Sequence, residues 1–370
     1  MIAQWKIKRE AARFRQQLRA IPEYFWEPIA NQRHNTAMAR GFPTTQGAQG
    51  LAPKIAIILL YQPGGLAASI GVLCCHLAKT GHAILIVSNT ILADEDRATL
   101  AGMVWRIIER PNFGYDFGGY RDGLWHLSHW GIVPQRLVIM NDSIWFPLHD
   151  SDNTLARMEA MDVDVAGTVL RERGAARFLE SYLFSIRGSV LTHPEFRAFW
   201  REFSLTSNKY KVIRRGERGF GTALVAAGLT IGGLFTRRDF DAAIARASDA
   251  DLRLFLQFTA HQDPQIAKEG AALAQQTDCN DWKDRAKAYI ERVLAKGLFY
   301  SSFPVAAVKL LDYPIMKKSA EPISAGWRRS YVTAVKNGIL QKPMHPILDE
   351  MVRLELVTED GTTTDLESKA

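Results

Sequence analysis

The sequence predicts an α/β fold built on a mostly parallel sheet, and three observations support this prediction. Short apolar runs rich in β-branched residues recur between residues 54 and 140, and they are too short for helices. Segments with a helical pattern separate these runs, as in β-α-β units with parallel strands. Polar clusters directly follow several of the runs. In open α/β sheets, ligands bind at this end of the strands.

The elements follow from the spacing of apolar residues and from turn residues. Four buried strands are expected, at 54–61, 82–87, 104–108 and 137–140. Helices are expected between them, at 66–79, 94–103 and about 119–131. Further strands are expected at 163–169 and 181–186, the second being a candidate for an antiparallel course. Further helices are expected at 151–161, from His193 onward, and at 220–227.

The chain divides into three expected segments. Residues 1–50 form a basic amphipathic helical segment and a Gly/Pro-rich linker, residues 51–240 form the α/β domain, and residues 241–370 form a helical extension that packs on the core. With 370 residues, 47% of them hydrophobic, the chain is long enough to bury a sizeable core.

The net charge of +7 favours an anionic partner, but charge alone does not separate a nucleotide from a membrane surface or nucleic acid. The basic segment 1–30 is either a helix docked on the body or an interfacial helix on anionic lipid. No nucleic-acid-binding motif is present, which argues against nucleic acid. Three cysteines without metal-ligand spacing indicate a reducing compartment, and no apolar run is long enough to span a bilayer. We therefore expect a cytoplasmic protein.

Asn141-Asp142-Ser143 directly follows the strand expected at 137–140. One carboxylate with neighbouring amide and hydroxyl oxygens can hold Mg²⁺ or Mn²⁺ when substrate phosphates complete the shell. The same group can bind a sugar hydroxyl, or simply close the strand as an Asx turn.

A Gly-rich segment after residue 108 carries a second polar cluster. Glycines at 114, 118 and 119 let a backbone approach a ligand closely, the aromatic rings can stack on a base or sugar, and arginine can meet a phosphate. The alternative is a helix N-terminus capped by Asp116. The candidate binding residues are Asn112, Tyr115, Asp116, Tyr120, Arg121 and Asp122.

Glu217 is the third acid of interest. It precedes an expected helix, whose dipole would keep the carboxylate ionised and able to accept a proton from a hydroxyl. Arg215 and Arg218 beside it can take diphosphate oxygens. The alternative is a capping or solvated glutamate.

Two motifs resemble the rhamnan synthesis protein F family of bacterial polysaccharide biosynthesis. They are ERPNFGYDFGGYRDGL, which begins at Glu109, and MNDSIWFPL, which begins at Met140. A glutamate shortly before a helix that ends in glycine is similar too, matched here by Glu217 and Gly228. The resemblance spans about residues 54–235. It implies a GT-A-like fold, with a Rossmann-type sheet that binds a nucleotide-sugar.

The resemblance also implies an activity. Such proteins are expected to be inverting glycosyltransferases that move rhamnose, or a related sugar, from a dTDP-rhamnose-like donor to a growing cell-surface polysaccharide or lipopolysaccharide. The acceptor would be a glycan or lipid-linked glycan at the inner face of the membrane. Asp142 would hold the donor diphosphate, directly or through Mg²⁺ or Mn²⁺, and Glu217 would be the general base.

The acidic motif departs from the usual Asp-x-Asp, because only Asp142 is a carboxylate. This leaves metal dependence open. It also keeps two other functions open, namely a non-catalytic scaffold of a polysaccharide assembly complex and a hydrolase or phosphotransferase acting on anionic glycans.

Overall fold

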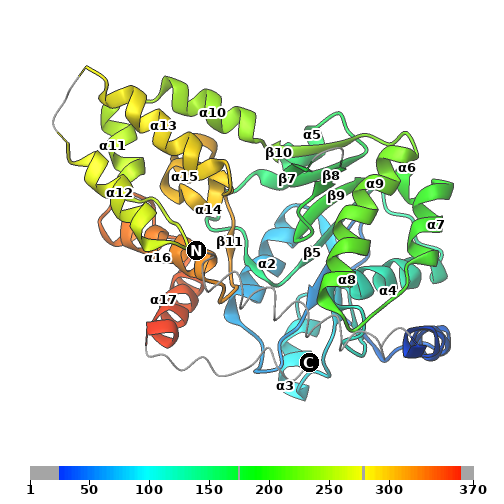
Figure 1. Ribbon diagram of the computed structural model, residues 1–370. Helices are drawn as coiled ribbons and strands as arrows, with labels where there is room; N and C mark the ends of the chain where they lie inside the picture. Colours follow the sequence, from blue (N-terminus) through cyan, green and yellow to red (C-terminus); the bar gives the residue numbers. More distant parts are fainter. Residues whose placement is uncertain (1–24, 174–175, 277–279, 360–370) are drawn as a thin grey trace.

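The computed structural model describes residues 25–173, 176–276 and 280–359 (Figure 1). Its main sheet has the strand order β1-β4-β3-β2-β5-β9-β7-β10, with β8 paired to β7. The strands are β1 (Thr44–Gln46), β2 (Lys54–Leu60), β3 (His82–Ser88), β4 (Arg106–Glu109), β5 (Arg136–Asn141), β7 (Val165–Arg173), β8 (Ala176–Leu179), β9 (Leu183–Arg187) and β10 (Ile231–Phe235). The short strands β6 (Ile144–Trp145) and β11 (Met316–Lys317) form a separate antiparallel pair.

The central strands β4, β3, β2 and β5 run parallel to one another. β9 lies antiparallel between β5 and β7, and β10 is parallel to β7. The predicted α/β class with a mostly parallel sheet is therefore confirmed, as is the antiparallel course of the strand near 181–186. The sequence reading missed β10 and the β7–β8 hairpin, and it assigned the segment that contains β1 to a linker.

Side chains alternate strictly between the two faces of the central strands, so each face of the sheet has its own hydrophobic core. In β2, Ile55, Ile57 and Leu59 face one side of the sheet, and Ala56, Ile58 and Leu60 face the other. This follows from the two-residue period of a strand buried on both faces. The first face is covered by α4 (Tyr115–His129), α7 (Pro194–Glu202), α9 (Gly219–Ala226) and the helix over residues 25–40.

The opposite face is covered by α2 (Ala68–Lys79), α5 (Thr154–Ala160) and the C-terminal helices. These helices pack beside the sheet in Figure 1 and bury Phe240, Phe255, Trp282 and Trp327 in the same core as α2. They are α10 (Arg237–Arg246), α11 (Asp249–Gln257), α12 (Pro264–Ala274), α13 (Trp282–Leu294), α14 (Phe299–Ser302), α15 (Pro304–Leu311), α16 (Pro322–Lys336) and α17 (His345–Glu359). The remaining helices are α3 (Asp94–Ala101), α6 (Gly188–Leu191) and α8 (Lys209–Ile213).

The Gly-rich segment is a helix rather than an open turn. Tyr115 begins α4, and Gly118 and Gly119 lie in its first turns. A Cβ on Gly119 would lie 1.9 Å from Leu59 Cδ1, and one on Gly118 would lie 2.3 Å from the Phe113 carbonyl oxygen. The expectation that these glycines admit a ligand is not supported, because Gly119 lets α4 pack directly on the sheet and Gly118 lets it pack against the segment that precedes it.

The structure describes one part of the expected N-terminal segment and not the other. Most of the basic stretch 1–30 lies outside the described residues, so its proposed contact with lipid stays a prediction. The described helix 25–40 docks on the α4 face through His34 and Met38. Across the described ranges, no helix combines the length and apolar character needed to cross a membrane.

Candidate active site

Asp142 lies at the point where the order of the parallel strands reverses. Chain order runs outward from β2 to β3 and β4, and then returns to β5 on the other side of β2. Ligands of open α/β sheets bind in the crevice at such a point, outside the carboxyl ends of the strands. The Asp142 amide donates to the Leu59 carbonyl (3.1 Å), and its Oδ2 accepts from the Tyr61 amide (2.9 Å) and Gln62 Nε2 (2.5 Å). These bonds fix the carboxylate between the ends of β2 and β5.

Asn141 and Ser143 connect this strand end to α4. Asn141 Nδ2 donates to Asp116 Oδ2 (2.9 Å), while Asn141 Oδ1 accepts from the Ser143 amide (3.1 Å) and hydroxyl (2.6 Å). The second set of bonds is the Asx turn that the sequence allowed. The turn also orients the Asn141 side chain so that its amide nitrogen points toward a second acid, Asp116.

Asp116 therefore lies in an acidic environment. Burial and the nearby negative charges of Asp142 and Glu217 raise the pKa of the Asp116 carboxyl from 3.8 to about 6. The Asn141–Asp116 hydrogen bond joins α4 to the strand end that carries Asp142. Hydrogen bonds from Tyr120 of α4 to Ser181, and from Ser181 to Glu217, connect the same helix to the third acid. The structure thus brings together three acids that are far apart in the sequence.

Glu217 is placed differently from the expectation. It lies in a π-helical turn, η1 (Arg214–Arg218), that joins α8 to α9 within one continuous helix. It is therefore in mid-helix, and the argument from a helix N-terminus is wrong. A Cβ on Gly216 would lie 2.4 Å from the Phe117 ring, so the glycine allows this turn to pack against α4. π-Helical turns of this kind are frequent at functional sites.

Glu217 is largely removed from solvent, and this reverses the expected direction of its pKa. Burial raises the pKa of Glu217, and a hydrogen bond from Ser181 partly offsets the rise. The Ser181 hydroxyl donates to Glu217 Oε1 (2.6 Å), and the Tyr120 hydroxyl donates to the Ser181 carbonyl (2.9 Å). A carboxylate with a raised pKa is a stronger base than a solvated one, which suits it to accept a proton.

Arg121 and Asp122 occupy the interior instead of the site. Asp122 Oδ2 accepts from Arg110 Nε (2.6 Å) and lies 2.7 Å from His34 Nε2, while Arg121 Nε and Nη2 contact Asp122 Oδ1. Arg121 also donates to the Phe203 carbonyl. Both side chains are almost fully buried. Their expected contact with substrate is replaced by a structural role, in which they tie α4 to β4 and to the helix over 25–40.

The other predicted binding residues also have protein partners. Asn112 Oδ1 accepts from Asn89 Nδ2 (3.0 Å), and the Tyr115 hydroxyl donates to the Ser207 carbonyl (2.9 Å). Arg215 pairs with Glu27, and the Arg218 guanidinium lies 5.9 Å from the centre of the Phe178 ring. None of these contacts belongs to the hydrogen-bond network that connects Asp116 to the end of β5.

Two lysines that the sequence did not suggest lie beside the acids. Lys317 Nζ lies 3.6 Å from Glu180, and its charge offsets part of the rise that burial causes in the pKa of Glu217. Lys318 donates its amide to the Ser143 carbonyl (2.8 Å). Burial raises the pKa of Asp142, and the charge of Lys318 offsets part of that rise. Both come from the β11 region of the C-terminal extension. No signal in the local sequence connects this region to residues 141–143, since only tertiary pairing does so.

The donor atoms around Asp142 do not fit a divalent cation held by protein ligands. One carboxylate oxygen already accepts two hydrogen bonds, and Asn141 turns its nitrogen toward Asp116. Within the described ranges, no three His, Cys, Asp or Glu side chains are grouped so that they could hold a metal ion. The expected metal ligand Asp142 would therefore depend on substrate oxygens to complete a shell.

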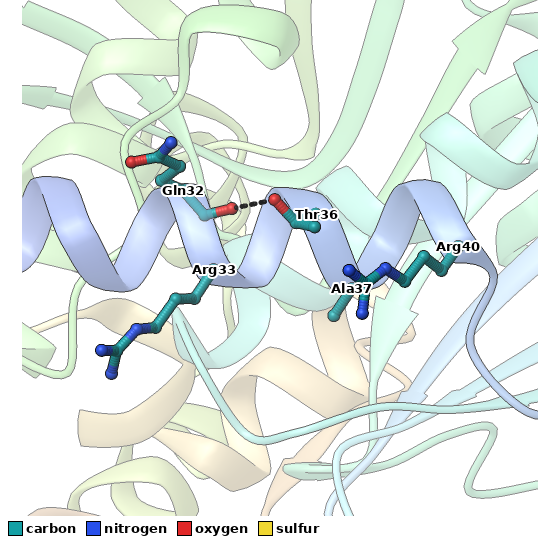
Figure 2. Close-up of a pocket in the computed structure, with 5 residues that line it drawn as sticks. All are labelled: Gln32, Arg33, Thr36, Ala37 and Arg40. Atoms are coloured by element: carbon teal, nitrogen blue, oxygen red, sulfur yellow. Dashed lines mark hydrogen bonds between the residues drawn. The ribbon is translucent and has the colours of Figure 1, made fainter.

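A hollow on the surface of the helix over 25–40 is separate from the acids. Figure 2 shows its lining residues, among which the Thr36 hydroxyl donates to the Gln32 carbonyl (2.9 Å). Its lining is Gln32, Arg33, Thr36, Ala37 and Arg40. It carries no acid and no nucleophile suited to catalysis, so the candidate active site is the acidic cluster at the strand ends.

The three acids lie within a single family region. Residues 84–255 match the rhamnan synthesis protein F family. The resemblance seen in the two motifs is thereby confirmed. The rhamnan synthesis protein F region includes Asp116, Asp142 and Glu217, and it ends well before Lys318.

Similarity to a whole protein extends beyond this region. The chain is 27% identical to the uncharacterized protein y4gN of Sinorhizobium fredii, over 97% of this chain and 93% of that protein.

Solved structures with some likeness to the chain include two glycosyltransferases. The mannosyltransferase PcManGT of Pyrobaculum calidifontis, in complex with GDP-Man and Mn²⁺, is 13% identical, with a TM-score of 0.29 over 87% of this chain and 97% of that one. TarS of S. aureus, in complex with UDP-GlcNAc, is 11% identical, with a TM-score of 0.32 over 83% and 92%. At TM-scores this low, neither likeness bears on residue roles in the rhamnan synthesis protein F region.

Proposed function

We propose that this protein is an inverting glycosyltransferase that uses a nucleoside diphosphate sugar. The observation that carries the proposal is the convergence of Asp142, Asp116 and Glu217 at the strand ends where open α/β sheets bind ligands. The family match supports a role in polysaccharide synthesis. The donor that fits this family name is a dTDP-rhamnose-like compound, and the product is a cell-surface polysaccharide or lipopolysaccharide.

The donor half of the site is the edge of the sheet at the carboxyl ends of β2 and β5. Its nucleotide would lie over the ends of these strands, with the diphosphate near Asp142 and the backbone amides after β2. Asp116 and Asn141 would form hydrogen bonds with sugar hydroxyls. Because its pKa is raised to about 6, Asp116 takes up a proton more readily than an ordinary aspartate when a negatively charged diphosphate lies beside it.

The acceptor half is built around Glu217. An acceptor hydroxyl oxygen attacks the anomeric carbon of the donor from the face opposite the diphosphate. The bond between that carbon and the diphosphate oxygen breaks, the hydroxyl proton passes to Glu217, and the nucleoside diphosphate leaves. Ser181 holds the Glu217 carboxylate in one orientation throughout.

The acceptor we propose is a glycan or lipid-linked glycan at the cytoplasmic face of the membrane. The net charge of +7 supports contact with an anionic surface. Cosedimentation with vesicles tests this part. The full chain should pellet with anionic vesicles and stay in solution with neutral ones, and equal behaviour with both would contradict it.

A donor screen tests the activity itself. The full-length protein is heated with dTDP-rhamnose, GDP-mannose or UDP-GlcNAc, and a bound donor raises the unfolding midpoint. We expect the dTDP sugar to give the largest rise, followed by turnover when a glycan acceptor is added. Donor binding without turnover would favour the scaffold function. Failure to bind any donor, together with cleavage of an anionic glycan, would favour the hydrolase and contradict the proposal.

A further inference from the structure

Lys318 reaches the donor half of the site through strand pairing. β11 lies antiparallel to β6, with Lys317 opposite Ile144. One residue farther, the Lys318 amide donates to the Ser143 carbonyl (2.8 Å), so Lys318 lies next to the residue that follows Asp142. A residue from the C-terminal extension is thereby fixed at the strand end by backbone hydrogen bonds.

The ammonium of Lys318 is enclosed but has few partners. Its side chain is 18% exposed, Nζ donates to Ser69 Oγ (3.1 Å), and it lies 5.6 Å from the centre of the Trp145 ring. An ammonium has three donors. Among the described residues, the Ser69 hydroxyl is the hydrogen-bond acceptor that Lys318 meets.

Glu350 is an ion-pair partner of Lys318, but most of its hydrogen bonds come from other groups. Its carboxylate accepts from the Ser69 amide (2.8 Å), the Ser69 hydroxyl (2.7 Å) and Trp145 Nε1 (2.7 Å), and it lies 3.9 Å from Lys318 Nζ. At 3.9 Å the two groups form a long ion pair without a hydrogen bond, so Glu350 offsets part of the charge of Lys318 and leaves its N–H donors available. A half-enclosed cation with spare donors beside an acid is suited to an anionic ligand.

Lys318 lies near Asp142, where the protein lacks the ligands needed to hold a divalent cation. The charges of Lys318 and Asp142 each shift the pKa of the other group toward its charged form, while burial opposes both shifts. Ser69 stands in the first turn of α2, which follows β2 at the same edge of the sheet. A cation is thus already present at the place where a leaving diphosphate needs one.

We infer that Lys318 binds the diphosphate of the donor and stabilises the negative charge of the departing nucleoside diphosphate, in the role that a divalent cation has in metal-dependent transferases. This inference rests on the proposed function. Lysine binds phosphate as a point charge, and no bidentate geometry is required. The residue lies outside the rhamnan synthesis protein F region, so the family match does not assign it.

Calorimetric titration in the presence of EDTA tests the inference. The probes are dTDP, UDP and GDP, with the corresponding nucleosides as phosphate-free controls. The full chain is compared with Lys318→Met, Lys318→Arg and, as a matched control on an exposed helix position, Lys309→Met. We expect the Met variant to bind the preferred nucleoside diphosphate about tenfold or more weakly. The Arg and Lys309 variants should stay close to wild type, and nucleoside affinity should not change.

The outcomes separate the two proposals. If wild type binds a nucleoside diphosphate and Lys318→Met binds it equally well, the role of Lys318 is wrong and the glycosyltransferase proposal stands. Loss of wild-type binding in EDTA that Mn²⁺ restores equally in wild type and Lys318→Met would also overturn it. If wild type binds none of the probes under any condition, both proposals fail. Lys318→Gln replaces the Met variant if the latter does not fold.

Discussion

The Ser181 hydroxyl lies 2.6 Å from Glu217 Oε1 and donates a hydrogen bond to it. Ser181 directly precedes the Tyr182 carbonyl that accepts from the Asn141 amide, so one short segment contacts both halves of the site. The proposed base and the donor half are therefore held in a fixed relation by the segment that leads into β9.

Replacing Glu217 with Gln should abolish most sugar transfer. The amide keeps the shape of the side chain but cannot accept the hydroxyl proton, and a positioned base typically contributes a factor of about 10² to 10⁴ in rate. Turnover is measured by release of nucleoside diphosphate, and donor binding by calorimetry. Glu291→Gln, on an outer helix, is the matched control. Normal turnover by Glu217→Gln would show that another group is the base.

Ser181→Ala should shift the pH dependence of transfer. The hydrogen bond from Ser181 lowers the pKa of Glu217, so its loss raises that pKa further. Because the base must be deprotonated, the acidic limb of the kcat/KM profile should move to higher pH. Ser181→Thr keeps the hydroxyl and should restore the wild-type profile. A uniform fall in rate at every pH would instead indicate a purely structural role.

Asp116 should make stability depend on pH. Its folded-state pKa of about 6 lies above the unfolded value of 3.8, so the native state binds the proton more tightly. Stability is therefore highest below the unfolded pKa and falls as the pH rises through about 6. Relative to Asp116→Asn, wild type should lose up to about 3 kcal/mol of unfolding free energy between pH 4 and pH 7. Urea denaturation at a series of pH values measures this, and parallel curves for the two proteins would contradict it.

Asp122→Ala should destabilise the fold strongly. Arg110 and His34 would lose their buried carboxylate partner, and removing one member of a buried ion pair typically costs about 3 to 5 kcal/mol. Burial alone would raise the pKa of Asp122, but the Arg110 charge and the His34 hydrogen bond outweigh it and lower the pKa to about 2. Thermal unfolding measures the loss. If the variant unfolds like wild type but binds donor weakly, Asp122 contacts substrate after all.

Local patterns were sufficient to predict the central sheet and the position of Asp142. Runs such as 54–61 and 137–140 are apolar on both faces, which requires a strand covered by helices on both sides. The polar residue after such a run then lies at the ligand-binding edge whatever the remaining topology is. The position of Asp142 directly after β5 thus follows from its sequence neighbours, while its role in binding stays a prediction.

Features that depend on packing between distant segments were not predicted. The glycines at 118 and 119 looked like a ligand loop, because the sequence does not show that Leu59 would press against them. The sequence predicts Glu217 just before a helix because it lies at the end of the basic stretch 209–218, whereas residues 214–218 continue α8 as a π-helical turn. Lys318 is brought to Ser143 by a strand of two residues, which is too short to recognise by pattern.

The β6–β11 pair determines the stage of protein synthesis at which the proposed site can form. Residues 144–145 and 316–317 must both have left the ribosome before that ladder closes, and Glu350 must follow before α2 gains its partner. A nascent chain can thus complete its central sheet first, yet it cannot place the Lys318 ammonium beside that sheet until β11 has been synthesised and has paired with β6. Fragments cut at the boundary of the family region would carry the acids without the cation that faces them.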